Sequence, residues 1–162
     1  CGAHRLAMCR AAAASSDWLR VSDAEVASPT YTRTLTVLQN LRADLAARHD
    51  GADVRPVLVC GADLVESFTV PGCWGEEDVR AILRDYGLVV VERVGLDVRA
   101  VLRGSPLLAP FEDHVLVVAP AMQNNLSSTM VRERVRQGKY VKYMVTDQVA
   151  EYIREHKLYQ EQ

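Results

Sequence analysis

A short segment, NNLSSTMVRERVRQGK at 124–139, combines hydroxyl side chains with several arginines. Its hydroxyls, at Ser127, Ser128 and Thr129, are of the kind that accept hydrogen bonds from the free N–H groups at a helix start. We therefore predict a helix from 127 to about 137, with Gly138 as its C-terminal stop. Because a helix turns once in about 3.6 residues, Arg132 falls on the side that Ser128 and Thr129 occupy.

This arrangement suits a phosphate group. The N-terminal end of a helix carries partial positive charge, and an arginine fork matches the oxygens of a phosphate. An ordinary serine-capped surface helix with solvated arginines would show the same spacing. The local sequence therefore leaves two interpretations open, a phosphate site and a plain surface helix.

The surrounding sequence predicts the elements that would position such a site. Three apolar runs are typical of strands buried on both faces of a parallel sheet: PVLVCGADL at 56–64, LVVVERV at 88–94 and HVLVVAP at 114–120. Helical patterns occupy 3–15, where Leu6, Met8 and Cys9 offer a buried face, as well as 30–47 and 76–87. WLRVSDAEV at 18–26 is predicted as a strand and a loop.

Alternation of strands and helices predicts an α/β protein with a doubly wound parallel sheet flanked by helices. In such sheets ligands bind beyond the carboxyl ends of the strands. The segments that follow the three apolar runs, CGAD, ERVG and QNNLSST, should therefore face one crevice.

Composition narrows the class of protein. The 162 residues are 49% hydrophobic and 25% charged, which predicts one globular domain, 1–162, with a helical part at about 127–159. A net charge of -2 argues against nucleic-acid binding. The sequence has neither an apolar run of about 18 residues nor a signal-peptide pattern, so we expect an intracellular protein, cytoplasmic or nuclear, without a membrane partner. The four cysteines show no metal-ligand spacing, which predicts reduced thiols packed as small apolar side chains, without a disulfide or a metal cage.

Three segments together carry a family resemblance: LVCGADLVESFTVPGCW at 58–74, YGLVVVERVG at 86–95 and NNLSSTMVRERVRQGKYVKYMVTDQVAEYIREHKLY at 124–159. They resemble eukaryotic nicotinamide mononucleotide adenylyltransferases, of the nucleotidyltransferase superfamily. The resemblance implies a Rossmann-like fold and transfer of AMP from ATP to nicotinamide mononucleotide (NMN) or nicotinic acid mononucleotide (NaMN). The products would be NAD or deamido-NAD and pyrophosphate, formed by direct in-line attack with Mg²⁺ bound to ATP.

The resemblance also implies roles for particular residues. Arg132, Ser128 and Thr129 would be catalytic, and the ATP-binding residues would be Ser127, Ser128, Thr129, Arg132, Gly61, Asp63 and Asn124. The mononucleotide would be bound by Trp74, Glu25 and Arg93, with the indole stacked on the pyridine ring. Plainer interpretations remain open: a turn glycine beside a helix-capping aspartate, a surface salt bridge for Arg93, and a core position for Trp74. His4 matches a position near the mononucleotide pocket, whereas the other histidines, His49, His114 and His156, are expected to be surface or satisfied residues.

The chain departs from the family pattern in three places. Ala24 stands where a second Trp is common, so the pyridine ring would be stacked on one side only or completed by Tyr31. Met130 stands where a Lys often follows the SST motif. The family's first strand, its phosphate loop and a histidine precede the segment that matches Ala3, so we expect an N-terminal βα unit to be missing from this chain.

Two other functions compete with NMN or NaMN adenylyl transfer. One is adenylyl transfer to another phosphate acceptor, such as phosphopantetheine or FMN. The other is a non-catalytic, chaperone-like or scaffold relative. We also expect a homo-oligomer whose partners are small-molecule nucleotides.

Overall fold

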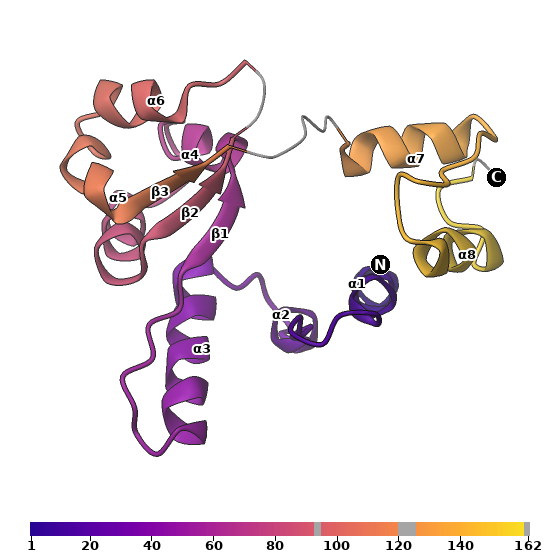
Figure 1. The fold of residues 1–162 in the computed structure, drawn as a ribbon, viewed down its shortest axis with the longest axis horizontal. Coiled ribbons are helices and arrows are strands. Elements are labelled where there is room, and N and C mark those ends of the chain that lie inside the picture. Colours follow the sequence, from indigo (N-terminus) through magenta and orange to yellow (C-terminus); the bar gives the residue numbers. More distant parts are fainter. Residues whose placement is uncertain (93–94, 120–125, 161–162) are drawn as a thin grey trace. The chain divides into compact units, whose positions relative to one another are not determined.

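The computed structural model describes residues 1–92, 95–119 and 126–160 (Figure 1). These residues form two compact units. We call residues 32–125 the sheet unit, and residues 1–31 together with 126–162 the helical unit.

Three parallel strands form the centre of the sheet unit: β1 (Leu58–Gly61), β2 (Leu88–Val91) and β3 (Val115–Val118), in the order β1-β2-β3. The register aligns Leu58 with Leu88 and Leu88 with Val115. The predicted parallel α/β sheet is therefore confirmed, and each strand lies inside the run predicted for it.

The sequence predicted strands buried on both faces, but only one face of the sheet is buried. Side chains on one face belong to the core, including Leu88, Val90 and Val115. On the other face Val59 is 66% exposed and Leu116 is 60% exposed. An apolar run cannot distinguish these cases, because a strand made only of β-branched and aliphatic residues reads the same whichever face is covered.

Helices of the sheet unit contribute side chains to the core on this face of the sheet. They are α3 (Thr34–Arg48), α4 (Ala62–Ser67), α5 (Glu76–Ala81), which continues as the π-helical turn η1 (Ile82–Tyr86), α6 (Val98–Gly104) and the 3₁₀ segment η2 (Ala109–His114). α4 packs against β1 and β2, and also against α6 (Figure 1). The fully buried side chains of these helical segments include Val65, Val79, Ile82, Leu83, Val98 and Leu102.

The helical unit has a separate small core. Its helices are α1 (Gly2–Ala13), α2 (Ala24–Ala27), α7 (Ser128–Arg136) and α8 (Asp147–Glu155). Val131, Val141, Val149 and Ile153 form this core, and Met8 of α1 packs against it. The predicted helix at 3–15 is confirmed, but Cys9 lies exposed rather than on its buried face.

The strand predicted within 18–26 does not form. Trp18 to Val21 are without regular structure, and α2 follows from Ala24. An isolated strand leaves its N–H and C=O groups unpaired, and none of the described strands pairs with this segment.

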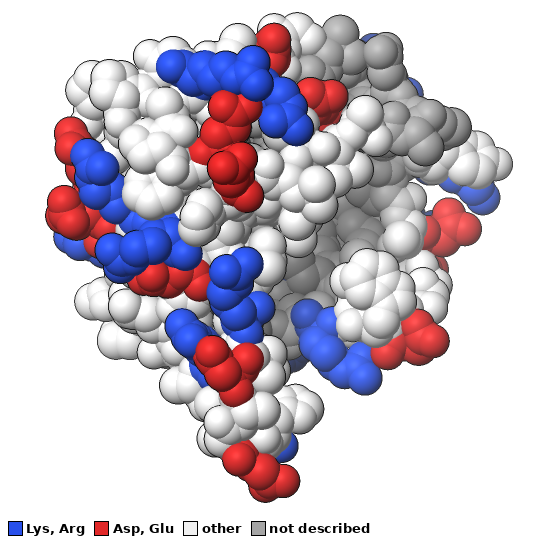
Figure 2. All heavy atoms as spheres, turned by 60° about the vertical axis from the view of Figure 1, so that its left-hand side comes forward, with Lys and Arg blue, Asp and Glu red and all other residues white. Residues whose placement is uncertain are grey.

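Side-chain charges are mixed rather than segregated on the face shown in Figure 2, where basic and acidic groups lie interspersed. Within the sheet unit, three ion pairs join basic to acidic side chains: Arg42–Asp53, Arg84–Asp85 and Arg103–Glu112. The hydrogen bond from Arg103 lowers the pKa of the Glu112 carboxyl. Such pairing neutralises basic side chains that would otherwise attract a polyanion.

All four cysteines are free thiols. Cys60 is half-buried, but Cys1, Cys9 and Cys73 are exposed, so the prediction that the thiols pack as apolar side chains is wrong for those three. No helix in the described ranges is both long and apolar enough to cross a membrane.

Candidate functional site

The start of α7 has the geometry that its sequence predicts. Ser127 is the N-cap, and its Oγ accepts a hydrogen bond from the backbone N–H of Met130 at 3.1 Å. Nη2 of Arg132 donates to Oγ1 of Thr129 at 3.0 Å. Ser128 and Thr129 are exposed and Arg132 is half-buried, so hydroxyls and a guanidinium meet at an accessible helix start.

The other two arginines of α7 have different partners. Arg136 forms an ion pair with Glu133, and Nε of Arg134 donates to the backbone carbonyl of Tyr140 at 3.2 Å. Arg132 makes no ion pair within the described part of the chain, so its positive charge is not neutralised there by a carboxylate. An anion at the start of α7 would supply that missing charge.

At the sheet, the parallel register places the ends of the three strands side by side. Gly61 aligns with Val91, and Val91 aligns with Val118. The segments that follow these residues therefore leave the same edge of the sheet. The predicted site residues Arg93 and Asn124 lie outside the described residues, as does the QNN part of QNNLSST.

Asp63 lies just beyond this edge, in the first turn of α4, and is exposed. A Cβ built on Gly61 would stand only 2.5 Å from Oδ1 of Asp63, so the carboxylate folds back over the glycine. Any side chain at position 61 would displace this carboxylate. Burial raises the pKa of the neighbouring Cys60 thiol from 9.0 to about 11, and the negative charge of Asp63 adds to that shift.

Trp74 is half-buried in the loop between α4 and α5. Its Nε1–H donates to Oγ of Ser67 at 3.0 Å. The ring of Phe68 meets the indole edge-on, with centroids 4.9 Å apart and planes at 88°. The indole thus packs against the core but keeps part of its surface accessible.

Sequence-predicted residues are divided between the two units. The sheet unit holds Gly61, Asp63 and Trp74, and the helical unit holds Ser127, Ser128, Thr129 and Arg132. Glu25 also belongs to the helical unit, where it is exposed in the first turn of α2. Ala24 opens the same helix, and Tyr31 is exposed.

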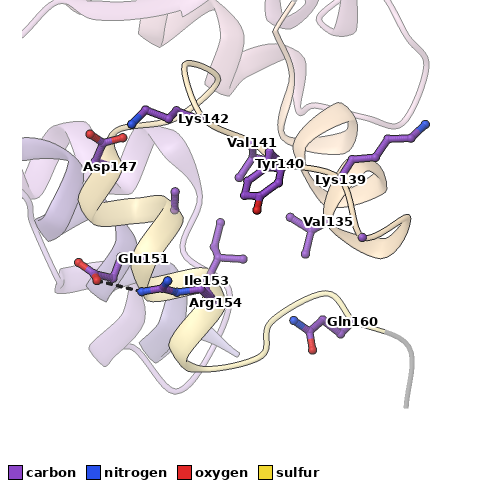
Figure 3. Close-up of a pocket in the computed structure, with 12 residues that line it drawn as sticks. Val135, Lys139, Tyr140, Val141, Lys142, Asp147, Glu151, Ile153, Arg154 and Gln160 are labelled. Atoms are coloured by element: carbon purple, nitrogen blue, oxygen red, sulfur yellow. Dashed lines mark hydrogen bonds and ion pairs between the residues drawn. The ribbon is translucent and has the colours of Figure 1, made fainter.

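Outside the predicted site, one hollow in the helical unit has a volume of about 530 Å³. Figure 3 shows Val135, Tyr140 and Ile153 around it, together with the Glu151–Arg154 ion pair. Of the sequence-predicted site residues that the structure describes, none lines this hollow. No group of three or more His, Cys, Asp or Glu side chains in the described ranges is arranged to hold a metal ion.

Comparison with known families decides the relationship. The cytidylyltransferase-like family model matches residues 2–134. The chain belongs to the cytidylyltransferase-like family.

Several relatives of this chain are named nicotinamide/nicotinic acid mononucleotide adenylyltransferase. The protein from Oryza sativa is 38% identical over 161 residues, which cover 98% of this chain and 65% of the relative. A protein from Caenorhabditis elegans, numbered 2 in its name, is 37% identical over 162 residues, which cover 96% of this chain and 72% of the relative. A relative from Saccharomyces cerevisiae is 34% identical, and the match with this chain covers 42% of that relative's length. The resemblance inferred from the sequence motifs is confirmed, and the chain spans about two thirds of the rice relative.

Two features of this cytidylyltransferase-like chain escaped the sequence analysis. Ser67 contacts Trp74, and the only sequence signal is a hydroxyl seven residues before the Trp, on the helix that precedes its loop. His4 is partnered rather than free: its Nδ1 lies 2.9 Å from the hydroxyl of Tyr152, whose ring stacks on His156 at 3.9 Å. Single side-chain contacts such as these produce no repeating pattern of residue types, so the sequence does not indicate them.

Proposed function

We propose that this protein transfers AMP from ATP to NMN or NaMN and forms NAD or deamido-NAD with release of pyrophosphate. The observation that carries the proposal is the start of α7, where Arg132 lies hydrogen-bonded to Thr129 without a carboxylate partner in the described residues. Its relatives' names support the acceptor, because each of them is a mononucleotide adenylyltransferase.

In the proposed reaction, a 5′-phosphate oxygen of the mononucleotide attacks the α-phosphorus of ATP in line with the departing pyrophosphate. A P–O bond forms between the mononucleotide and the α-phosphorus. The bond from the α-phosphorus to the oxygen that bridges it to the β-phosphate breaks, and this oxygen leaves with the pyrophosphate. Negative charge accumulates on the leaving pyrophosphate as this occurs. Donors placed at Ser127, Ser128, Thr129 and Arg132 would stabilise that charge more than they stabilise bound ATP, and only such a difference accelerates the step.

The sheet unit would bind the nucleosides. Gly61 would allow close approach of adenosine, and Asp63 would accept hydrogen bonds from ribose hydroxyls. Trp74 would stack on the pyridine ring, whose positive charge in NMN favours an indole face. Glu25, Arg93 and Asn124 complete the proposed set of contacts.

Mg²⁺ would arrive with ATP, bound to oxygens of the triphosphate. The described residues do not themselves form a cage of metal ligands. When bound, the ion would add positive charge at the triphosphate. The contribution of the chain is then the hydroxyls and the guanidinium at α7, which position the phosphates.

We further propose that small-molecule nucleotides are the ligands, that the protein acts in the cytoplasm or nucleus, and that it forms a homo-oligomer. Light scattering on the full-length protein measures the oligomeric state, and a fluorescent fusion locates the protein. A purely monomeric protein, or one found outside these compartments, would remove the corresponding part of the proposal.

Product analysis tests the activity. Full-length protein with ATP and Mg²⁺ is supplied with NMN, NaMN, phosphopantetheine or FMN in turn, and nucleotide products and pyrophosphate are separated and quantified. We expect NAD from NMN or deamido-NAD from NaMN, in amounts equal to the pyrophosphate. An adenylylated product formed only with phosphopantetheine or FMN would reassign the acceptor. ATP binding without any product would favour a non-catalytic role.

A further inference from the structure

A short relay of hydrogen bonds links the indole of Trp74 to the backbone of α4. Trp74 Nε1–H donates to Ser67 Oγ at 3.0 Å, and the Ser67 hydroxyl donates to the carbonyl oxygen of Leu64 at 2.6 Å. An indole nitrogen can only donate, and a serine hydroxyl has a single proton, which here goes to Leu64. The directions of both bonds are therefore fixed.

The ring is also held from a second side. Phe68, which is 4% exposed and part of the core, meets the indole edge-on. Such an edge-to-face contact restrains the ring but does not by itself fix its rotation. The hydrogen bond at Nε1 supplies a second contact, and these two contacts together with the covalent bond from Cβ hold the plane of the indole.

The backbone around Trp74 belongs to no helix or strand. The residue lies in a turn after α4, beyond Gly72, whose φ is +77°. The orientation of the indole therefore depends on its side-chain contacts with Ser67 and Phe68. Both contacts are made by side chains of the sheet unit itself, so they can hold the ring plane independently of a ligand.

We propose that Ser67 is a positioning residue that fixes the plane of the Trp74 indole for stacking on the pyridine ring of the mononucleotide. This role rests on the function proposed above. A preoriented ring loses less conformational freedom on binding than a mobile one, so the gain appears in affinity. Ser67 thereby sets the affinity for the mononucleotide and leaves that for ATP unchanged.

Kinetics of Ser67→Ala in the full-length protein test this role. If stacking stabilises the bound substrate and the transition state equally, weakening it raises the KM and leaves the kcat unchanged. We expect the KM for NMN to rise roughly threefold to tenfold, the range that follows from losing one net hydrogen bond. The KM for ATP and the kcat should stay within about twofold of wild type. Ser67→Thr retains the hydroxyl and should restore the KM for NMN.

Thr69→Ala is the matched control. The Thr69 hydroxyl donates to the carbonyl oxygen of Glu66 at 2.8 Å, a bond of the same kind as that from Ser67 to Leu64, but no contact joins it to Trp74. Loss of a hydroxyl from this part of the chain should therefore leave the KM for NMN unchanged. Ser67→Cys is close in size but accepts hydrogen bonds weakly, and it replaces Ser67→Ala if the alanine variant does not fold.

A spectroscopic measurement follows the indole without reference to activity. In a Trp18→Phe background, which removes a Trp that is 79% exposed, Trp74 is the one remaining fluorophore of its kind in the chain. Ser67→Ala should lower the steady-state anisotropy of Trp74 and speed hydrogen exchange at its indole N–H. Thr69→Ala and Ser67→Thr should not.

The outcomes separate the two proposals. Unchanged indole exchange in Ser67→Ala would overturn the positioning role, as would a KM for NMN that stays at the wild-type value after the indole has loosened. Equal losses in the kinetics of ATP and NMN would show general structural damage, which also overturns it. If wild type makes no dinucleotide, the proposed function fails, whereas the exchange measurement still decides whether Ser67 restrains Trp74.

Discussion

At the start of α7, Arg132 differs from its neighbours in the partners of its guanidinium. Arg136 is paired with Glu133 and Arg134 with a backbone carbonyl, whereas Arg132 contacts the Thr129 hydroxyl. The charge of Arg132 is thus balanced by no carboxylate in the described ranges. Its removal should alter ligand binding and catalysis more than folding.

Arg132→Ala should lower kcat about a hundredfold, equivalent to roughly 3 kcal/mol of barrier, since it removes one preorganised donor to the developing charge. The midpoint of thermal unfolding should change little, because the side chain lacks an ion pair in the described residues. Arg136→Ala is the matched control on the same helix and should leave kcat near wild type. Turnover by Arg132→Ala within a few-fold of wild type would remove the assigned role.

Gly61→Ala should raise the KM for ATP without unfolding the protein. The new Cβ would stand 2.5 Å from Oδ1 of Asp63 and displace that carboxylate, which is the end of a flexible, exposed side chain. We expect a KM increase of roughly tenfold, the scale of one charge-assisted hydrogen bond. Gly104→Ala meets nothing within 4 Å and serves as the control in steady-state assays. An unchanged KM in Gly61→Ala would show that Asp63 does not contact ATP.

The Cys60 thiol should resist alkylation in the native protein. Its pKa is raised to about 11 by burial, so near pH 8 almost none of it is thiolate, whereas the exposed thiols of Cys1, Cys9 and Cys73 react. Because the folded pKa exceeds the unfolded one, the stability tied to the protonated thiol is present below about pH 9 and declines as pH rises toward 11. Mass spectrometry after brief iodoacetamide treatment checks this. Rapid labelling of Cys60 at pH 8 would contradict it.

At the scale of helices and strands, the sequence predicted those features that depend on residues close together in the chain, such as the two ends of α7. Ser127 caps α7 and Gly138, with φ +67°, follows its end, both as the sequence indicated. The strand at 18–26 and the burial of both sheet faces were wrong, because each depends on what lies alongside in space. Pairing partners and covering layers are set by distant residues, and no window of sequence contains them.

Gly87 connects the helical segment α5–η1 to β2, and its replacement tests how tightly that connection is made. Its φ is +74°, and an added Cβ would stand 2.9 Å from the backbone oxygen of His114. Gly51 has nearly the same φ, +79°, but an added Cβ there would meet nothing within 4 Å. The pair therefore separates backbone strain from a steric clash.

Gly51→Ala should lower the free energy of unfolding by roughly 1 to 2 kcal/mol, the cost of a side chain in the left-handed region. Gly87→Ala should lower it by about 3 kcal/mol or more, because the clash with a backbone atom adds to that cost. Urea denaturation of both variants measures the difference. Equal losses in the two would show that the sheet unit relaxes around the new methyl group at Gly87.

For the whole molecule, the sequence predicted the family and a set of site residues but not their division between two compact units. Asp63 lies in the sheet unit and Arg132 in the helical unit. Motifs such as GADLVESF and SSTMVR identify each part separately. Nothing in their spacing along the chain indicates which residues share a core, because long-range packing sets the units.

Because the proposed function assigns Asp63 and Arg132 to the same ATP molecule, ATP binding should protect the residues around both of them. With Mg²⁺ and a non-hydrolysable ATP analogue, we expect slower backbone hydrogen exchange at 61–64 and at 127–132, with the same dependence on analogue concentration, because a single binding event couples the two. Asp63→Ala should weaken protection at α7 as much as at α4, although Asp63 belongs to the other unit. Asp113→Ala, an exposed carboxylate before β3, should alter neither. Protection of one unit alone, or two different concentration dependences, would mean that the triphosphate and adenosine contacts do not form one site.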